Sequence, residues 1–538
     1  MKVVNIKNSK GETVVPAMLQ VQGAPHVVGK ESRLIEGGEF TCDIKEKYVY
    51  VRKLSIGSNK ISISDDAVIV ESLLNITSNK PSVKFGNVVY TAHTVTFDAI
   101  SESELLNCYI KVLYSIAGEE YSKVTVEIPS ASTEVTASIP DVKFNLKVPF
   151  VWTTDDAGLQ DFRTAWRTFN GYPPITANEW IRGEKSLATA LPENGKAWSD
   201  YVPYQYSDGV GGMRRAAFSC AVMYPEDILG TLHQDKFSFE DVLIMQVFGT
   251  SMNYHDVYVK SDIGDPTREE DFINRFAYEA KLMQERGGIG FKVAIEPSGN
   301  KEYIYSANKS KAVCLYIAQV AGSANGVYFA PANKSISEWE QGDDYFSFLY
   351  KPNEVLIRRF APLTVDDFKA DLNTVDNAIL IYGSHGYFLA LDEFLQYVQT
   401  NRDDVWICST DELWEWFHLK NHTIIDSCIG DGEKVTLTMY VPNIQYHQFR
   451  ELTVNLNITD GGTPTVSDNV IGLSYTQSAD KYTLNISLEE RWVQNAAKFV
   501  SLSKQYPGNG CFRRDAEYLI GLLKDGEVKD SLLSELDS

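Results

Sequence analysis

Two adjacent carboxylates, Asp155 and Asp156, follow an apolar and β-branched run at residues 144–151. This pattern predicts a buried strand whose end presents both acids to a cleft. Buried like charges cost free energy unless a metal ion, a basic partner or a shared proton compensates them, so the pair is a candidate site. The alternative is structural, because Asp156 also suits the N-cap position of a helix predicted at residues 159–169.

More polar residues come directly after predicted strands farther along the chain. They are His255, Glu296 and His385, with Pro297 and Ser298 next to Glu296. In parallel α/β sheets, chemistry gathers at the carboxyl ends of the strands. A single histidine is more often packed or surface-exposed than a ligand or an acid, so the order of the whole set carries the argument.

That order resembles the polysaccharide deacetylases of carbohydrate esterase family four, which carry the NodB-homology domain. The resemblance covers about residues 147–425. Thr153-Thr154-Asp155-Asp156 stands where the family has a Thr-Phe-Asp-Asp strand end. The resemblance implies that Asp155 is the general base and that Asp156 is a ligand of the metal ion.

Two middle motifs match the family in part. His255 stands at the first position of a His-(Ser/Thr)-x-x-His motif, whose second position holds Val259. Pro297 and Gly299 fit an Arg-x-Pro-x-Gly motif, whose Arg position holds Ile295. The metal motif is therefore incomplete, and the arginine that orients the base in the family is replaced.

The last part of the region adds a general acid to the resemblance. The run from Leu380 to His385 is a looser form of the family's Leu-x-His motif, which implies that His385 is the acid. The run at residues 405–414, VWICSTDELW, resembles the family's closing strand and helix. The fold that this implies is a distorted (β/α) barrel of polysaccharide-deacetylase type.

The resemblance also implies a cofactor, Zn²⁺ or another divalent metal, which polarises an acetyl carbonyl and lowers the pKa of its bound water. Its implied ligands are Asp156 and His255, and the backbone N–H of Ser298 is an implied donor to the oxyanion. Catalytic zinc usually keeps three protein ligands, so one is missing from the motif. Candidates for it are His233, Asp256 and Asp262.

Two further residues suit a glycan substrate. Trp180 lies in an aromatic-rich insertion and offers an apolar face to a sugar ring, or else packs on the domain. Arg214, next to Arg215, suits an anionic sugar or phosphate, or else forms a solvated charge pair.

The pattern of expected elements divides the chain into four parts. Alternating runs separated by turns predict one or two β-sandwich domains at residues 1–146. Strands alternating with amphipathic helices predict the barrel at 147–428. A small β domain at 429–490 and a helical tail at 491–538 follow. Expected strands of the first part include 60–64, 68–74, 88–97 and 122–128; those of the barrel are 148–152, 242–248, 290–295, 312–318, 377–382 and 405–408, and its expected helices are 159–169, 268–286, 365–373, 389–400 and 410–419.

The composition narrows the classes of partner and compartment. A net charge of −22 argues against a general binder of nucleic acid or of anionic membranes. Seven cysteines without a CxxC pair indicate neither a zinc knuckle nor a disulfide framework. The amino terminus lacks the apolar core of a signal peptide, and no stretch reaches the length of a membrane span. We therefore expect cytoplasmic synthesis, followed by release by lysis as part of a virion or by secretion after loss of a leader.

The sequence as a whole predicts a metal-dependent deacetylase that acts on an acetylated bacterial surface polysaccharide. The first alternative is a catalytically degenerate glycan-binding or structural protein of a phage virion, a tail or fibre component with virion proteins or its own copies as partners. The incomplete metal motif and the flanking β domains motivate it. The second alternative is a glycoside hydrolase on a related barrel, with Asp155 and Glu296 as its two carboxylates.

Overall fold

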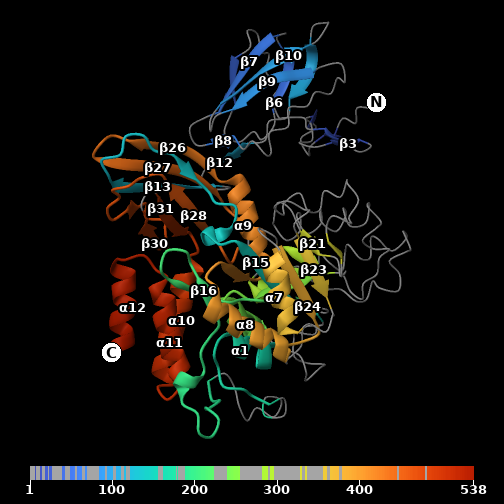
Figure 1. Cartoon of the computed structure of the whole chain (residues 1–538). Coiled ribbons are helices and arrows are strands. Elements are labelled where there is room, and N and C mark those ends of the chain that lie inside the picture. The colour runs from blue at the N-terminus through green and yellow to red at the C-terminus, as the bar shows by residue number, and fades with distance from the viewer. Residues whose placement is uncertain are drawn as a thin grey trace. The chain divides into compact units, whose positions relative to one another are not determined.

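The computed structural model describes residues 121–155, 161–176, 179, 188–222, 239–254, 281–288, 291–295, 364–374, 379–444, 447–478 and 481–538, and strands alone between residues 6 and 116 and between 327 and 359. Its contacts group the chain into two compact units (Figure 1). The smaller unit combines residues 1–128 with 421–443, and the larger combines 129–420 with 444–538. The four predicted parts, their boundaries and the sandwich form of the flanking domains remain predictions.

The smaller unit consists of strands in both of its segments. β9 (Lys84–Tyr90) and β10 (Thr94–Ile100) pair antiparallel, and β10 also pairs with β7 (Gly57–Ile63). The single strand expected at 88–97 is therefore wrong, because β-forming residues continue on both sides of a short connection that the sequence does not mark. In a second sheet, β27 (Lys434–Pro442) lies between β26 (Ile424–Gly430) and β13 (Tyr121–Pro129).

A nine-stranded, mostly parallel sheet organises the larger unit. Its centre is β15 (Val148–Thr154), which is buried along its whole length because both faces of the sheet are covered. The strand order is β21 (Val327–Phe329), β20 (Val293–Ile295), β19 (Ser251–Tyr254), β18 (Ser219–Val222), β15, β24 (Ile379–Ser384), β23 (Val355–Arg359) and β22 (Lys334–Ser335), and β25 (Val405–Cys408) also pairs with β15. The pairings are parallel except for that of β22 with β23. This mixed α/β architecture is as expected, whereas closure into a barrel remains a prediction.

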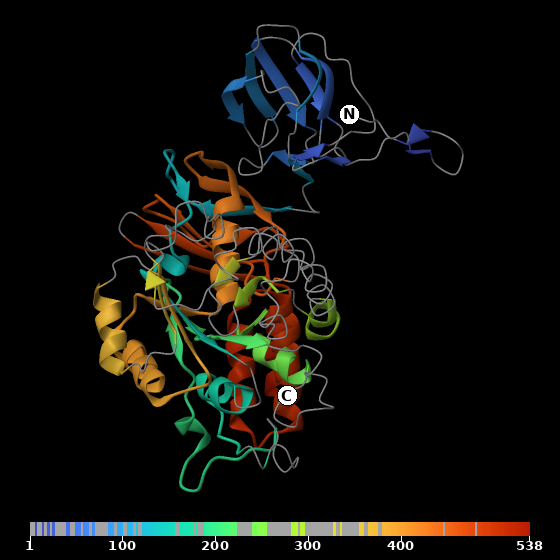
Figure 2. The same ribbon diagram turned by 90° about the vertical axis from the view of Figure 1, so that its right-hand side faces the viewer.

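Helices follow several of these strands where the sequence places them. The expected α7 (Val365–Thr374), α8 (Leu389–Asn401) and α9 (Thr410–His422) are confirmed. α7 and α8 lie on one side of the β15–β24 part of the sheet, and the carboxyl-terminal helices lie on the other (Figure 2). The segment after β15 is helical as well, with a π-helical stretch at Asp161–Trp166 that leads into α1 (Arg167–Phe169).

One expected strand is a helix. Of the residues expected as a strand at 242–248, all but the last belong to α3 (Phe239–Val247), whose buried side chains are Phe239, Val242 and Met245. These positions are three residues apart, so the buried face follows a helical period. A short continuous apolar run does not distinguish a buried strand from a buried helix, which explains the error.

The last part of the larger unit joins an antiparallel sheet to three helices. The sheet order is β14 (Ala137–Ser138), β28 (Glu451–Leu456), β31 (Tyr482–Ser487) and β30 (Gly472–Gln477). α10 (Arg491–Gln505) and α11 (Gly510–Gly521) follow, and then α12 (Glu527–Asp537). The Asn509 side chain caps α11 by accepting the N–H of Cys511. Among the described helices, none is long and apolar enough to cross a membrane.

Candidate functional site

Two of the predicted catalytic residues lie side by side at the carboxyl edge of the sheet. β15 and β24 are adjacent and parallel, with Thr154 opposite Ser384. The backbone N–H of Asp155 donates to the carbonyl of Ser384 at 2.8 Å, directly before His385. Asp155 is 5% exposed, and His385 is exposed to solvent. This edge therefore combines a largely buried carboxylate with an accessible imidazole.

The turn that carries His385 is fixed to the end of β15 by one hydroxyl. Thr154 Oγ1 accepts the N–H of Gly386 at 3.0 Å and donates to Asp161 Oδ1 at 2.9 Å. Gly386 has a φ of +98°, which favours glycine. The chain segments after both strands are thus tied together, which limits the positions that Asp155 and His385 can take.

A buried polar cluster that the sequence did not predict fills the space between β25, β18 and β19. Thr410, the first residue of α9, donates its N–H to Ser219 Oγ at 2.8 Å. Its hydroxyl lies 3.0 Å from Ser251 Oγ and 2.7 Å from Asn253 Nδ2. All four residues are almost completely buried. The signal in the sequence was a small polar residue at the start of β18, β19 and α9, which is too common to stand out.

The other predicted residues of this site lie outside the described residues. They are the proposed ligands Asp156 and His255, the oxyanion and substrate residues Pro297 and Ser298, and Trp180. Among the residues that are described, no group of three His, Cys, Asp or Glu side chains could hold a metal ion. The described residues alone therefore do not supply the roughly three protein ligands that a catalytic zinc ion needs.

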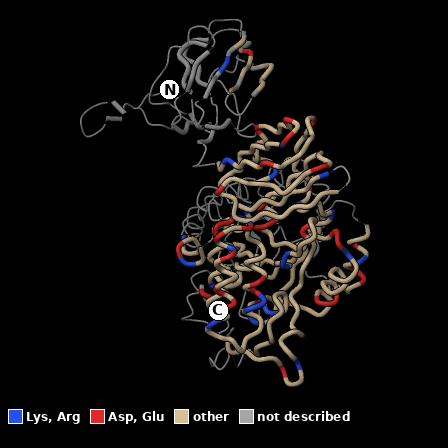
Figure 3. The backbone as a smooth tube through the Cα atoms, turned by 90° about the vertical axis from the view of Figure 1, so that its left-hand side faces the viewer, with Lys and Arg blue, Asp and Glu red and all other residues tan. Residues whose placement is uncertain are grey.

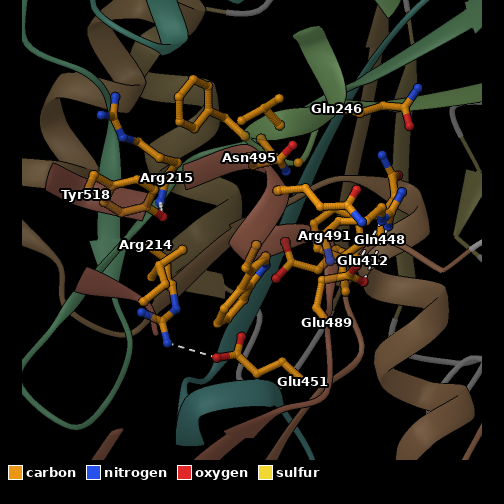
Figure 4. A pocket seen from close by; sticks show the side chains of 18 of the residues that line it. Arg214, Arg215, Gln246, Glu412, Gln448, Glu451, Glu489, Arg491, Asn495 and Tyr518 are labelled. Carbon is orange, nitrogen blue, oxygen red and sulfur yellow. Dashed lines mark hydrogen bonds and ion pairs between the residues drawn. The ribbon is translucent and has the colours of Figure 1, made fainter. Parts of the chain in front are cut away.

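Arg214 is not brought together with the catalytic candidates. It belongs to β17 (Met213–Arg215) and lines a pocket of about 260 Å³, whose lining includes neither Asp155 nor His385. Figure 4 shows this pocket with Arg214 and its partner Glu451. Its other walls come from Lys143 in the short 3₁₀ helix before β15, from the 448–451 segment and from α10 and α11.

This pocket lies at the opposite edge of the sheet from Asp155. Lys143 precedes β15, Arg215 precedes β18, Gly249 precedes β19 and Gly288 precedes β20, and all four line it. Residues that precede parallel strands share the amino-terminal edge of a sheet. We call it the amino-edge pocket.

A network of buried ion pairs forms one wall of the amino-edge pocket. Lys143 Nζ lies 2.9 Å from Glu412 Oε1 and 3.0 Å from Glu451 Oε2, and all three side chains are at most 5% exposed. Burial opposes the charge of Lys143, but the two carboxylates raise its pKa above the usual value. Burial likewise opposes the charge of Glu451, but Arg214 and Lys143 hold its pKa below the usual value.

Two further ion pairs surround the same pocket. Arg215 Nη2 is 2.6 Å from Asp515 Oδ1, and Arg491 Nε is 2.8 Å from Glu489 Oε1. Although burial opposes it, Arg491 together with His447 lowers the pKa of Glu489 to about 2. Acidic and basic residues are interspersed through the larger unit (Figure 3).

Gln448 also lines the amino-edge pocket, and no motif in the sequence marks it as a functional residue. Its side chain is 6% exposed, and neither Nε2 nor Oε1 has a hydrogen-bond partner among the described residues. Its backbone N–H donates to Glu415 Oε1 at 2.8 Å, which fixes the segment. Figure 4 places Gln448 beside Arg491 and Glu412. A buried amide without partners costs free energy, so this position is a candidate for ligand contact.

One family model matches more than half of this chain. The family model described as "Putative polysaccharide deacetylase" matches residues 233–537, a range that contains His385 and Gln448. A solved structure described as a "putative polysaccharide deacetylase from Mycobacterium smegmatis" is 13% identical with a TM-score of 0.27, and the match covers 53% of this chain and 95% of that one. A peptidoglycan N-acetylglucosamine deacetylase in complex with 4-naphthalen-1-yl-N-oxidanyl-benzamide is 10% identical with a TM-score of 0.25, with 51% and 90% covered. No curated protein sequence matches this chain.

Proposed function

Since this chain belongs to the polysaccharide deacetylase family, we propose that it is a carbohydrate deacetylase that removes acetyl groups from a bacterial surface glycan. The observation that supports the proposal most is the placement of Asp155 beside His385 at the carboxyl ends of β15 and β24. General acid–base catalysis of hydrolysis needs one group that takes a proton from water and another that gives a proton to the leaving group.

The proposed reaction uses the two side chains in sequence. Asp155 takes a proton from the attacking water, whose oxygen forms a bond to the acetyl carbonyl carbon. His385 then protonates the sugar amine or hydroxyl as its bond to that carbon breaks, and acetate leaves. The exposure of His385 suits contact with a polymer that cannot enter a deep cavity, whereas the burial of Asp155 keeps the carboxylate fixed.

Metal dependence is the finer part of the proposal. Asp156 and His255 are the residues that would hold Zn²⁺ or another divalent ion, which supplies polarisation of the acetyl carbonyl. Metal content of the purified full chain, measured by elemental analysis with and without a chelator, tests this part separately.

The test of the function is release of acetate by the full chain from N-acetylated and O-acetylated bacterial polysaccharides. Asp155→Asn should reduce kcat/KM by about 10²–10⁴-fold, the usual contribution of a general base. Asp403→Asn, which changes an exposed acid before β25, is the matched control and should leave the rate unchanged.

Three outcomes would overturn the proposal. An unchanged rate of acetate release in Asp155→Asn would remove the assigned base. New reducing ends without acetate would indicate a glycoside hydrolase. Glycan binding without any product, together with trimers or hexamers in solution, would favour a structural protein of a virion.

A further inference from the structure

The amino-edge pocket has the size of a single small ring. Its volume of about 260 Å³ lies below the ~300–1,000 Å³ that is typical of pockets for drug-sized ligands. Its residues come from segments far apart in the sequence, so the pocket exists only in the folded larger unit. It is at the opposite edge of the sheet from Asp155 and plays no part in the proposed reaction.

The charges of the amino-edge pocket already neutralise one another. Lys143 pairs with two glutamates, and Arg214 pairs with Glu451 at 2.8 Å. Arg215 and Arg491 each have a carboxylate partner as well. The remaining cation of the lining, Lys498, is exposed to solvent. An ionic ligand would have to displace one of these buried partners, so the pocket favours a neutral and polar one.

Gln448 specifies the polar group that such a ligand should carry. Its amide has one donor group, the NH₂ at Nε2, and one acceptor, Oε1, both buried and without partners among the described residues. An acetamido group and a hydroxyl next to it on a sugar ring satisfy both, because the acetamido carbonyl accepts from Nε2 and the hydroxyl donates to Oε1. A site that leaves an amide unpaired when empty gains the most from a ligand that pairs it.

Aromatic residues supply an apolar wall to the same pocket. Trp492 and Tyr518 line it together with Phe248 and Phe449. The Arg214 guanidinium lies 5.9 Å from the centre of the Trp492 ring, which holds the indole in place. The Tyr518 hydroxyl accepts the N–H of Arg215 at 3.0 Å. An aromatic face beside fixed polar groups suits a ring that has C–H groups on one side and polar groups on its edge.

We propose that the amino-edge pocket is a second carbohydrate site, which binds one neutral acetamido sugar unit and is separate from the acetyl-removing site. The amide of the sugar pairs with Gln448, and its ring packs on Trp492. The choice of a sugar over another neutral amide rests on the proposed function. Through this site the chain would hold the glycan that it deacetylates at a second point.

The experiment titrates N-acetylglucosamine into the full chain carrying Asp155→Asn and follows binding by calorimetry. Adding Gln448→Leu should weaken binding about tenfold or more, because the paired amide is lost. Its fold should be intact, since the change removes a buried amide that lacks partners; circular dichroism checks this. Gln399→Leu, the same change at an exposed position of α8 away from the pocket, is the matched control and should alter affinity less than twofold.

A second variant and a second ligand make the proposal falsifiable on their own. Trp492→Ala should weaken binding through loss of the ring contact, and glucosamine, which lacks the amide and carries a positive charge, should bind at least tenfold more weakly than N-acetylglucosamine. Equal affinity for the two sugars, or unchanged affinity in Gln448→Leu, would overturn the second site. If the second site is overturned in this way but the full chain still releases acetate, the proposed function is unaffected. If sugar binding depends on Gln448 but no acetate is released, the proposed function fails and the second site is unaffected.

Discussion

The two edges of the central sheet use charge in opposite ways. At the carboxyl edge, Asp155 lies beside an exposed histidine, and the hydrogen bonds that fix this edge come mainly from backbone and hydroxyl groups. At the amino edge, buried cations and carboxylates form ion pairs, and the pKa shifts of Lys143 and Glu451 keep both charged. Catalysis needs groups that exchange protons, whereas a structural network needs groups that keep their charge. The comparison therefore separates residues whose loss should affect activity from residues whose loss should affect stability.

The largest expected effect is on activity at the carboxyl edge. His385→Gln should lower kcat/KM by about 10²–10⁴-fold, because the leaving group then departs without a proton donor. Its urea-unfolding midpoint should match that of the unmodified chain, since the side chain is exposed. Acetate release and equilibrium unfolding are measured on the same preparation. Full activity in the folded variant would show that His385 is not the acid.

The next effect is on stability at the amino edge. Lys143→Met should lower the free energy of unfolding by about 3–5 kcal/mol, because it leaves two buried glutamates facing each other without their shared cation. Urea unfolding measures the loss, and kcat per folded molecule should be unchanged, since Lys143 is at the opposite edge of the sheet from Asp155.

Lys147→Met is the matched control for this change. The side chain of Lys147 is 67% exposed, and its contact with Asp404 is 3.9 Å. Its removal should change the free energy of unfolding by no more than about 0.5 kcal/mol. Equal losses in the two variants would contradict the contrast between a buried network and a surface pair.

A smaller effect depends on pH. Asp411, in the first turn of α9, is completely buried with Lys292 at 3.8 Å, and burial raises its pKa to about 7. The folded chain then keeps a proton that the unfolded chain loses near pH 4. Stability should therefore fall as the pH rises from about 4 to 7, by at most about 1.4 kcal/mol per pH unit from this group.

Asp411→Asn isolates this contribution. The variant carries no titrating group at the position, so its unfolding midpoint should depend less steeply on pH between 4 and 7 than that of the unmodified chain. Urea unfolding at several pH values measures both slopes. Parallel pH profiles would show that Asp411 titrates near its ordinary pKa in the folded chain.

The sequence predicts the elements of the carboxyl edge better than those of the amino edge. β15, β25, α7 and α8 have strong local signals, which are continuous apolar runs for the buried strands and a helical period for the helices. Asp155 and His385 could be proposed because each directly follows such a strand. In contrast, the helix at α3 was missed because its apolar residues at 242–245 form a run too short to show a helical period.

The amino-edge network depends on contacts that no local pattern encodes. Lys143 and Glu412 are 269 residues apart, and Arg214 and Glu451 are 237 apart. Each of these residues alone resembles an ordinary surface charge, and pairing arises only when the fold brings the segments together. Gln448 has no neighbouring motif either, and its importance depends on burial, which the sequence does not state.

The smallest expected effect tests whether every buried cation of the larger unit needs a carboxylate. Arg167 is 1% exposed; its Nε donates to the Pro173 carbonyl at 2.6 Å, and its two terminal nitrogens have no hydrogen-bond partner among the described residues. Burial lowers its pKa to about 10.

Arg167→Met removes a charge that costs free energy to bury and loses one hydrogen bond, so the free energy of unfolding should change by no more than about 1 kcal/mol. Arg215→Met is the matched change at a cation that does have a partner, and should cost up to about 3–5 kcal/mol because Asp515 loses its contact at 2.6 Å and keeps the one with Arg514 at 2.9 Å. Urea unfolding measures the free energy of unfolding of both variants. Equal decreases would mean that Arg167 stabilises the fold as much as a cation with a carboxylate partner, which would contradict the distinction between paired and unpaired buried cations.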